Sequence, residues 1–359
     1  MRSWTLALLA GAFCAACTGE VGGLDEGTAD VGSDDVGSDA TAEASPTDAG
    51  VDSTLTDTPT TDTGVAPDTT APPVDTGPAD AGSLDTGPPT GTDAVCARWK
   101  GDRASLGEGA WSGALASCTA GDVGAPGRAN TLKLVNLYRW LSGLPAVVDD
   151  PARNGTAQAC ALMMHANGTL SHSPPTSWKC YSATGAGSAG KSNISPTPAV
   201  ASIDLYMVDP GNATTIGHRR WILSNSLGPI GIGGTSGYSC LQVIGGGGSA
   251  GKEFTAWPPA GIVPLEAFAP PGSFSSVDAT GWTVQSDSIS FSGSTTATIA
   301  EDGVDRPVDV ATLANGYGST SALKITPKGW TTKAGKSYAV SVKGASKPID
   351  YVVQVVACP

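Results

Sequence analysis

The chain has 359 residues, with 20 Lys and Arg against 33 Asp and Glu and a formal net charge of -13 at pH 7. Seventeen of these acids lie between Thr18 and Ala94, so the remainder, from Val95 onward, carries sixteen acids and nineteen basic residues and is close to neutral. Because nucleic acids are held by strongly basic surfaces, this distribution excludes electrostatic capture of DNA or RNA as the chain's function.

The first seventeen residues have the pattern of an export signal. Arg2 provides a positive charge, residues 4–13 form an apolar run too short for a permanent membrane helix, and two small residues lead to Cys17. This ending is similar to a bacterial lipobox, which predicts lipidation of Cys17 and a lipoprotein at the outer membrane or cell surface. Cys14 stands where that pattern has Leu, so ordinary cleavage and secretion is the alternative.

Residues 18–94 are predicted to be a disordered acidic linker. They contain no Phe, Trp, Tyr, Lys or Arg, and Asp recurs among Thr, Gly, Ala and Pro, as in TDTPTTDTG at 56–64. Such a composition cannot bury enough apolar surface to offset the entropy lost on ordering. We therefore expect a solvated tether, with membrane attachment only through lipid, because no later stretch approaches the ~20 apolar residues of a membrane helix.

The folded remainder contains an even number of cysteines, which are Cys96, Cys118, Cys160, Cys180, Cys240 and Cys358. In an exported chain this predicts three disulfides. Six cysteines allow about fifteen pairings. Pairing sequence neighbours gives Cys96–Cys118, Cys160–Cys180 and Cys240–Cys358 as the starting hypothesis.

Three helices are predicted in the first half of the folded part. Apolar residues from Leu134 to Leu141 follow the i, i+3, i+4, i+7 spacing of one helix face. Asp150 can cap a second helix that has Pro151 at its first position and ends at Asn167 and Gly168. A third follows Pro198 through Met207.

Strands are predicted in the second half. Short apolar stretches between glycine clusters indicate strands at 230–232 and 241–244. From about Pro264 the chain is rich in Ser, Thr and Val, and candidate strands lie at 288–292, 297–300, 322–326, 338–342 and 351–356. This spacing is typical of a β-sandwich.

The order of motifs in the helical half resembles a known family. A helix ending in RWLSGLP, then AQACALMMHANGTLSHSPP, Asn193-Ile194, YMVDPG and GHRRWIL resemble bacterial members of the CAP superfamily (cysteine-rich secretory proteins, antigen 5, pathogenesis-related class 1), SCP-like extracellular domain proteins. The resemblance covers roughly residues 128–257. It implies an α+β chain in which a CAP-type α/β/α sandwich with a central cleft is followed by a β-rich, sandwich-like C-terminal domain.

The expected organisation therefore has four parts. Residues 1–17 are a lipoprotein-type signal peptide and residues 18–94 the linker. Residues 95–262 are the CAP-like domain, which includes an N-terminal extension bridged by cysteine, and residues 263–359 are the β-rich domain.

The resemblance also implies the cleft residues. His172 and His218 match the family's two cleft histidines. The Glu that usually precedes the family's Asn is replaced by Ser192, before Asn193. The second family acid corresponds to Asp209 if Tyr206 is the aromatic residue three positions earlier. With one acid missing, the set His172, His218 and Asp209 could just supply three zinc ligands. The alternative is that both histidines only donate and accept hydrogen bonds in a metal-free cleft. His165 is expected to be exposed.

Two short motifs, one typical of nucleotide-binding loops and one typical of esterases, are expected to be coincidental. GAGSAGKS at 185–192 satisfies a phosphate-loop pattern, but no long helix is predicted after it, so we interpret it as a flexible Gly/Ser loop over the cleft. GGSAG at 247–251 fits G-x-S-x-G but lies between predicted strands. We expect no nucleotide partner.

The function expected from the resemblance is binding of an extracellular apolar or polymeric ligand, such as a lipid or envelope polymer, through the central cleft. The alternative is a metal- or histidine-assisted hydrolase acting on peptides, esters or envelope polymers. Ser192 favours the first, because a catalytic histidine would lack its usual acidic partner. Adhesion through the β-rich domain is a third hypothesis.

Overall fold

The computed structural model of the protein describes residues 91–359. The predicted signal, Cys17 and the linker up to residue 90 lie outside the described residues. Thr92 to Ala94, expected at the end of the linker, instead begin helix α1 (Thr92–Arg103). The apolar pattern did not predict this helix because Val95 and Trp99 are its only buried residues. No helix among the described residues is long and apolar enough to span a membrane.

The three predicted helices are confirmed as α2 (Gly124–Leu141), α3 (Pro151–Asn167) and α5 (Ala199–Val208). The Asp150 carboxylate accepts hydrogen bonds from the first-turn amides of α3, and Gly168 ends that helix in the left-handed region at φ 62°. Two short helices, α4 (Ala183–Ala189) and α6 (Gly217–Ile222), complete this half.

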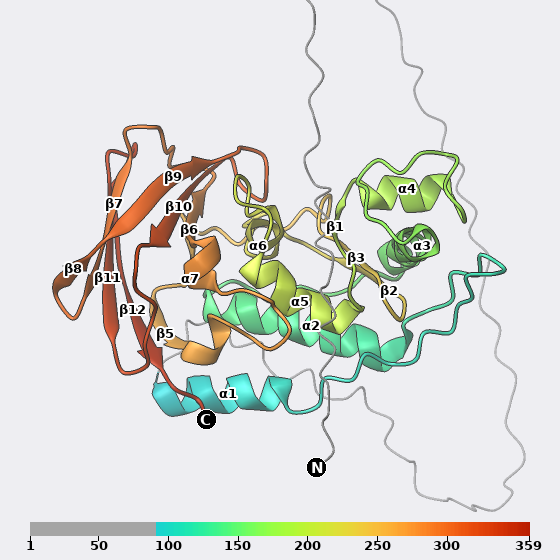
Figure 1. Ribbon diagram of the computed structural model, residues 1–359, viewed down its shortest axis with the longest axis horizontal. Coiled ribbons are helices and arrows are strands. Elements are labelled where there is room, and N and C mark those ends of the chain that lie inside the picture. The colour runs from blue at the N-terminus through green and yellow to red at the C-terminus, as the bar shows by residue number, and fades with distance from the viewer. Residues whose placement is uncertain (1–90) are drawn as a thin grey trace, which may run out of the picture. The chain divides into compact units, whose positions relative to one another are not determined.

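A small antiparallel sheet lies between these helices. It has the order β1-β3-β2, with β1 (Ser192–Ser195), β2 (Gly231–Gly234) and β3 (Ser239–Gln242). Figure 1 shows α3 and α4 on one side of this sheet, and α2 with α5 on the other. The α/β/α sandwich implied by the resemblance is therefore confirmed. Gly233 permits the close approach of α3, because a Cβ there would lie 2.1 Å from the carbonyl carbon of Ala157.

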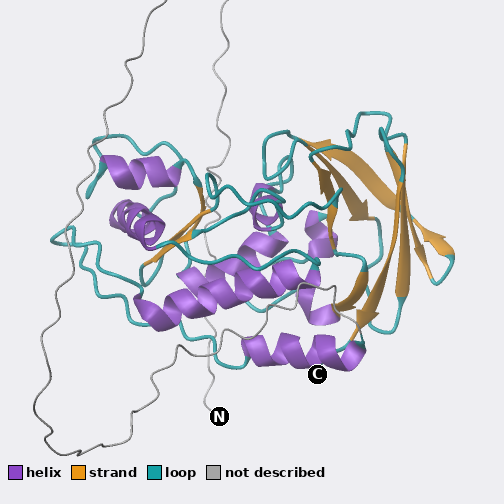
Figure 2. Cartoon of the chain, turned by 180° about the vertical axis from the view of Figure 1, so that it is seen from behind, coloured by secondary structure: helices purple, strands orange, loops and turns teal. Residues whose placement is uncertain are grey.

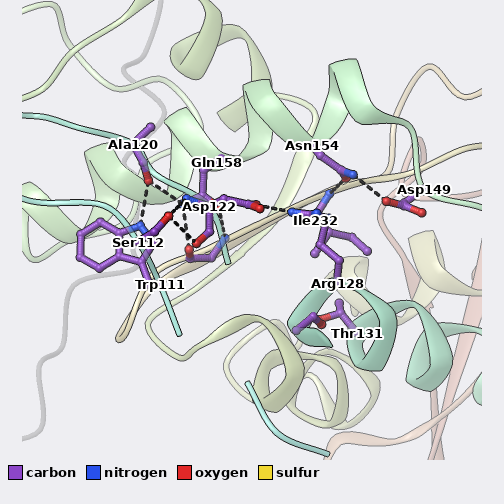
Figure 3. A network of polar contacts seen from close by, with 12 residues as sticks. Trp111, Ser112, Ala120, Asp122, Arg128, Thr131, Asp149, Asn154, Gln158 and Ile232 are labelled. Atoms are coloured by element: carbon purple, nitrogen blue, oxygen red, sulfur yellow. Dashed lines mark hydrogen bonds and ion pairs between the residues drawn. The ribbon is translucent and has the colours of Figure 1, made fainter. Parts of the chain in front are cut away.

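Polar side chains of α3 fasten the helix to the sheet (Figure 3). The Gln158 amide donates to the carbonyl oxygens of Ala120 (3.0 Å) and Gly234 (2.8 Å), and its oxygen accepts from the Gly234 amide (3.0 Å). Asn154 donates to Asp149 at 2.6 Å and accepts from the Ile232 amide at 2.7 Å. Because the backbone groups of Ile232 and Gly234 are buried, these side chains satisfy partners that water cannot reach.

The C-terminal half forms two sheets that face each other, seen edge-on in Figure 2. One has the order β4-β6-β10-β9, with β4 (Thr255–Trp257), β6 (Trp282–Ser286), β9 (Val308–Leu313) and β10 (Ser321–Pro327). The other has the order β5-β12-β11-β7-β8, with β5 (Gly261–Pro264), β7 (Thr296–Glu301), β8 (Val304–Arg306), β11 (Ser337–Lys343) and β12 (Ile349–Val356). Helix α7 (Val277–Thr280) precedes β6.

Aromatic packing joins the two sheets into a sandwich. Trp282 of one sheet and Tyr338 of the other are edge-to-face, with ring centroids 5.8 Å apart, and Trp330 stacks on Tyr338 at 5.7 Å. In β12 buried and exposed residues alternate, as a strand with one covered face requires. The predicted β-rich, sandwich-like region is confirmed.

The predicted strands at 297–300, 322–326, 338–342 and 351–356 are confirmed, and the one at 288–292 is wrong. The strand lies just before it, in β6, whose five residues are all buried and therefore show no alternation. The Ser286 hydroxyl accepts hydrogen bonds from the amides of Ser288 and Ile289, which turns the chain out of the sheet.

Strand β4 precedes the domain boundary expected between residues 262 and 263, and β5 spans it, yet both pair with C-terminal strands. The domain limits stay a prediction. The two halves are also joined by Arg219 of α6, whose guanidinium donates to the Gly281 carbonyl (2.6 Å) and the Thr280 hydroxyl (2.9 Å).

The prediction of three disulfides is confirmed, but the predicted pairing is wrong in every bond. The bonds are Cys96–Cys358, Cys118–Cys180 and Cys160–Cys240. Tertiary packing decides the partners: α1 lies beside the C-terminal end, and α3 packs on β3. Neither of these two packing contacts can be inferred from how close the cysteines are in the sequence.

Candidate functional site

A cavity of about 420 Å³ opens beside the edge of the small sheet. Four segments of the chain line it: His172, Gly190, Ser192 and Asn193; Asn212, Thr215, Gly217, His218 and Trp221; Val243 and Ile244; and Gly316 with Tyr317. The structure thus brings the predicted cleft residues His172, His218 and Asn193 to one concave surface.

Asp209 lies behind this surface and positions His218. It ends α5 in the left-handed conformation (φ 59°, ψ 50°), which Asp adopts more readily than most residues. One carboxylate oxygen lies 2.9 Å from His218 Nδ1 and 2.6 Å from the Asn212 amide nitrogen. The other accepts from the backbone amides of His218 (2.9 Å) and Arg219 (3.4 Å). The side chain of Asp209 has no exposed surface, whereas 23% of the His218 side chain is exposed.

Tyr206 packs against the His218 ring, with ring centroids 4.8 Å apart. Burial raises the pKa of its phenol. The aromatic ring three residues before Asp209 is therefore in contact with the histidine.

His172 lines the cavity from the segment between α3 and α4. The residue is exposed, and the Nδ1 atom of its imidazole lies 2.9 Å from the Ala189 carbonyl oxygen at the end of α4. Asn193 of β1 donates to the His218 carbonyl oxygen at 3.0 Å. Within residues 91–359, no hydrogen bond uses Nε2 of either histidine, so both nitrogens are available to a molecule in the cavity.

The expected flexible Gly/Ser loop at 185–192 is wrong. Residues 185–189 belong to α4, which the Ser182 hydroxyl caps by accepting from the Gly185 amide, and Ser192 opens β1. Gly185 lets α4 pack closely on α3, because a Cβ there would lie 3.0 Å from Ala159. The helix precedes Lys191, whereas a phosphate loop leads from a strand into a helix that follows its lysine.

The residues proposed for zinc do not form a ligand group. Among residues 91–359 no three His, Cys, Asp or Glu are arranged to hold a metal ion. Both Asp209 oxygens are already occupied by donors from the 209–219 segment, and the Ser192 hydroxyl donates to the Ser188 carbonyl oxygen at 2.7 Å. The donor set therefore does not fit the metal.

None of the described residues that line this cavity is an Asp, Glu, Lys or Arg. The neighbouring Arg219 is fully buried, and its guanidinium donates to the Met207 carbonyl oxygen (2.6 Å) and the Val208 carbonyl oxygen (3.0 Å). Burial lowers the pKa of Arg219 to about 10, while the Asp209 charge acts in the opposite direction. These contacts fix the segment that carries His218.

Sequence analysis missed several lining residues and misplaced one histidine. Trp221 and Tyr317 were not singled out, although an aromatic residue between glycines, as in NGYGS, is a sign of an exposed loop aromatic. His165 is half-buried rather than exposed. Its ring stacks on that of Tyr238, with centroids 5.3 Å apart. The ring centroid of Trp111, a residue of the N-terminal extension, lies 5.7 Å away.

Comparison with known proteins agrees with this geometry. Residues 132–241 match the model of the cysteine-rich secretory protein family, CAP. No curated protein and no solved structure gave a significant match to the chain. The matched segment runs from α2 to β3 and contains His172, Asn193, Asp209 and His218. A CAP domain with three disulfides fits an extracellular protein. Residues 132–241 therefore form a CAP domain.

Proposed function

We propose that this protein binds an extracellular ligand in its central cleft without chemically converting it. The observation that carries the proposal is the position of Asp209. Its carboxylate lies behind His218, has no exposed surface and cannot touch a molecule in the cavity. Ser192 offers no carboxylate either. The cavity therefore presents imidazoles, amides and hydroxyls, groups that hydrogen-bond a ligand, beside apolar surface of Val243 and Ile244.

The test is a ligand screen of the exported mature protein against lipid extracts and envelope polymers. Binding should be weakened in His218→Ala and Asn193→Ala, and unchanged in Val352→Ala, an exposed residue of β12 outside the cavity. A ligand recovered chemically altered would overturn the binding proposal. Binding that depends only on β-domain surface residues would favour adhesion instead.

One observation favours the hydrolase as a second candidate. A histidine whose Nδ1 is held by a buried carboxylate keeps Nε2 free to act as a general base, with its orientation fixed. Against it, no hydroxyl among the described residues hydrogen-bonds His218 Nε2, so water would have to be the nucleophile. Release of product from esters, peptides or envelope polymers that disappears in both His218→Ala and Asp209→Asn would establish this alternative.

Anchoring at the cell surface is a separate part of the proposal, supported by the lipobox-like ending at Cys17. Palmitate labelling and detergent-phase partitioning should both disappear in Cys17→Ala. Labelling that persists in this variant would exclude Cys17 as the attachment point.

A further inference from the structure

The loop between β9 and β10, which belongs to the β-sandwich, forms one wall of the CAP cleft. Gly316 and Tyr317 of this loop line the cavity together with His172 and His218. The loop is held in place by the other domain: Arg220 donates to the Ala314 carbonyl oxygen at 2.7 Å, and the Ala314 amide donates to the Thr214 carbonyl oxygen at 2.9 Å. The wall is therefore a fixed part of the site.

Tyr317 is positioned by a glycine on the opposite side. A Cβ at Gly217 would lie 2.7 Å from Cδ1 of Tyr317, so the ring packs directly over the backbone beside His218. Even so, 40% of Tyr317 is exposed. Its phenol thus presents a face to solvent at the mouth of the cavity.

Trp221 extends the site beyond this mouth. It lines the first cavity and also a second one of about 230 Å³, and Gly316 is shared by both. The second cavity continues over the β-sandwich, where Asp287 accepts a hydrogen bond from the Thr320 amide at 3.0 Å. A long ligand that enters beside His172 can therefore continue across Trp221 toward Asp287.

The chemistry of this path selects one class of polymer. The first cavity has no charged Lys, Arg, Asp or Glu in its lining, and the second adds the carboxylate of Asp287, which would repel an anionic chain. Two partly exposed aromatic rings, amides and hydroxyls suit a ligand whose monomers have apolar C–H faces and hydroxyl edges. A lipid tail would leave these polar groups without partners.

We propose that the cleft and the second cavity form one groove for a neutral polysaccharide, with Tyr317 and Trp221 as the residues on which sugar rings stack. This inference rests on the proposed binding function and names the ligand class of the same site. It also makes the β-sandwich part of the binding site.

The probes are dextran, laminarin and galactomannan, with heparin as an anionic polymer and phosphatidylcholine vesicles as a lipid surface. Affinity electrophoresis and calorimetry of the exported mature protein should detect at least one neutral polysaccharide, and neither heparin nor vesicles. Tyr317→Ala and Trp221→Ala should each raise the Kd about tenfold, the effect of losing an aromatic contact. Tyr317→Phe should stay within about twofold. Phe274→Ala, which removes an aromatic residue that is 88% exposed outside both cavities, is the matched control.

Gly217→Ala gives an independent variant, because the added Cβ displaces the Tyr317 ring without removing it. It should weaken binding as Tyr317→Ala does. Polysaccharide binding lost in His218→Ala but unaffected by Tyr317→Ala and Gly217→Ala would leave the binding function intact and overturn the composite groove. Binding of vesicles or heparin alone would overturn the ligand class.

Discussion

His218 Nδ1 lies 2.9 Å from Asp209 Oδ1, and the carboxylate is completely buried behind the imidazole. In a neutral ring this contact favours the tautomer with the proton on Nδ1, which leaves Nε2 as the hydrogen-bond acceptor. Asp209→Ala should lower the free energy of unfolding by about 2–4 kcal/mol, because the donors of His218 and Asn212 lose their partner and Ala is strained at φ 59°. Asp209→Asn, which tolerates that φ, should cost less. Urea unfolding measures the stability, and nitrogen NMR of His218 measures the tautomer; an unchanged tautomer in both variants would contradict this role.

Arg219 is a second residue whose replacement should be costly. Its guanidinium donates to four acceptors on α5 and around α7, and the residue has no exposed surface. Arg219→Lys should lower the free energy of unfolding by about 3–5 kcal/mol, because an ammonium group cannot reproduce the planar fork. The control is Arg98→Lys, at a partly exposed i,i+4 ion pair, which should change stability by less than about 1 kcal/mol. Equal effects would mean that Arg219 is not the link between the two halves.

The disulfide connectivity is testable by peptide mapping under non-reducing conditions, which should recover only the three observed pairs. Loop-entropy reasoning predicts that removal of Cys96–Cys358, which closes 262 residues, costs about 5.5 kcal/mol. The corresponding figure for Cys118–Cys180, which closes 62 residues, is about 4 kcal/mol. Denaturant unfolding of the paired Cys→Ser variants gives this order. A larger loss for the shorter loop would show that local packing outweighs chain entropy.

Buried tyrosines make stability depend on alkaline pH. Burial raises the pKa of Tyr138, with a further contribution from the Asp204 charge, and burial raises the pKa of Tyr351. Above the ordinary tyrosine value of about 10, the unfolded chain loses protons that the folded chain keeps. The free energy of unfolding should therefore fall as the pH rises above 10, and this contribution should be intact below it.

Phenylalanine variants separate the two phenols. Tyr138 donates to Asp204 at 2.6 Å, so Tyr138→Phe should cost about 1–3 kcal/mol at pH 7. The Tyr351 hydroxyl is buried without a hydrogen-bond partner within residues 91–359, so Tyr351→Phe should be neutral or slightly stabilising. Both variants should reduce the alkaline loss seen in urea unfolding at pH 7 and pH 11. An alkaline loss of wild-type size in both would assign it to other groups.

How much the sequence predicted depended on whether the signal was local. The ends of α3 are set by Asp150 and Gly168 within one helical turn, and the prediction was correct. Strand β6 is buried on both faces, so alternation could not reveal it. In the site, His172 and His218 were found from motif order, whereas Tyr317 depends on how a distant loop docks on the CAP domain, a relationship with no local pattern. The disulfide partners failed for the same reason.

The bond between Cys96 and Cys358 also affects how the folded part responds to proteolysis. It joins the first described helix to Cys358, two residues after the end of β12, so that the intervening chain is a covalently closed ring. A single cut anywhere in that ring leaves both fragments connected to whatever precedes Cys96. A single cut within the ring would therefore release no fragment, and separating a piece of the folded part would require a second cut in the ring or reduction of this bond after the first.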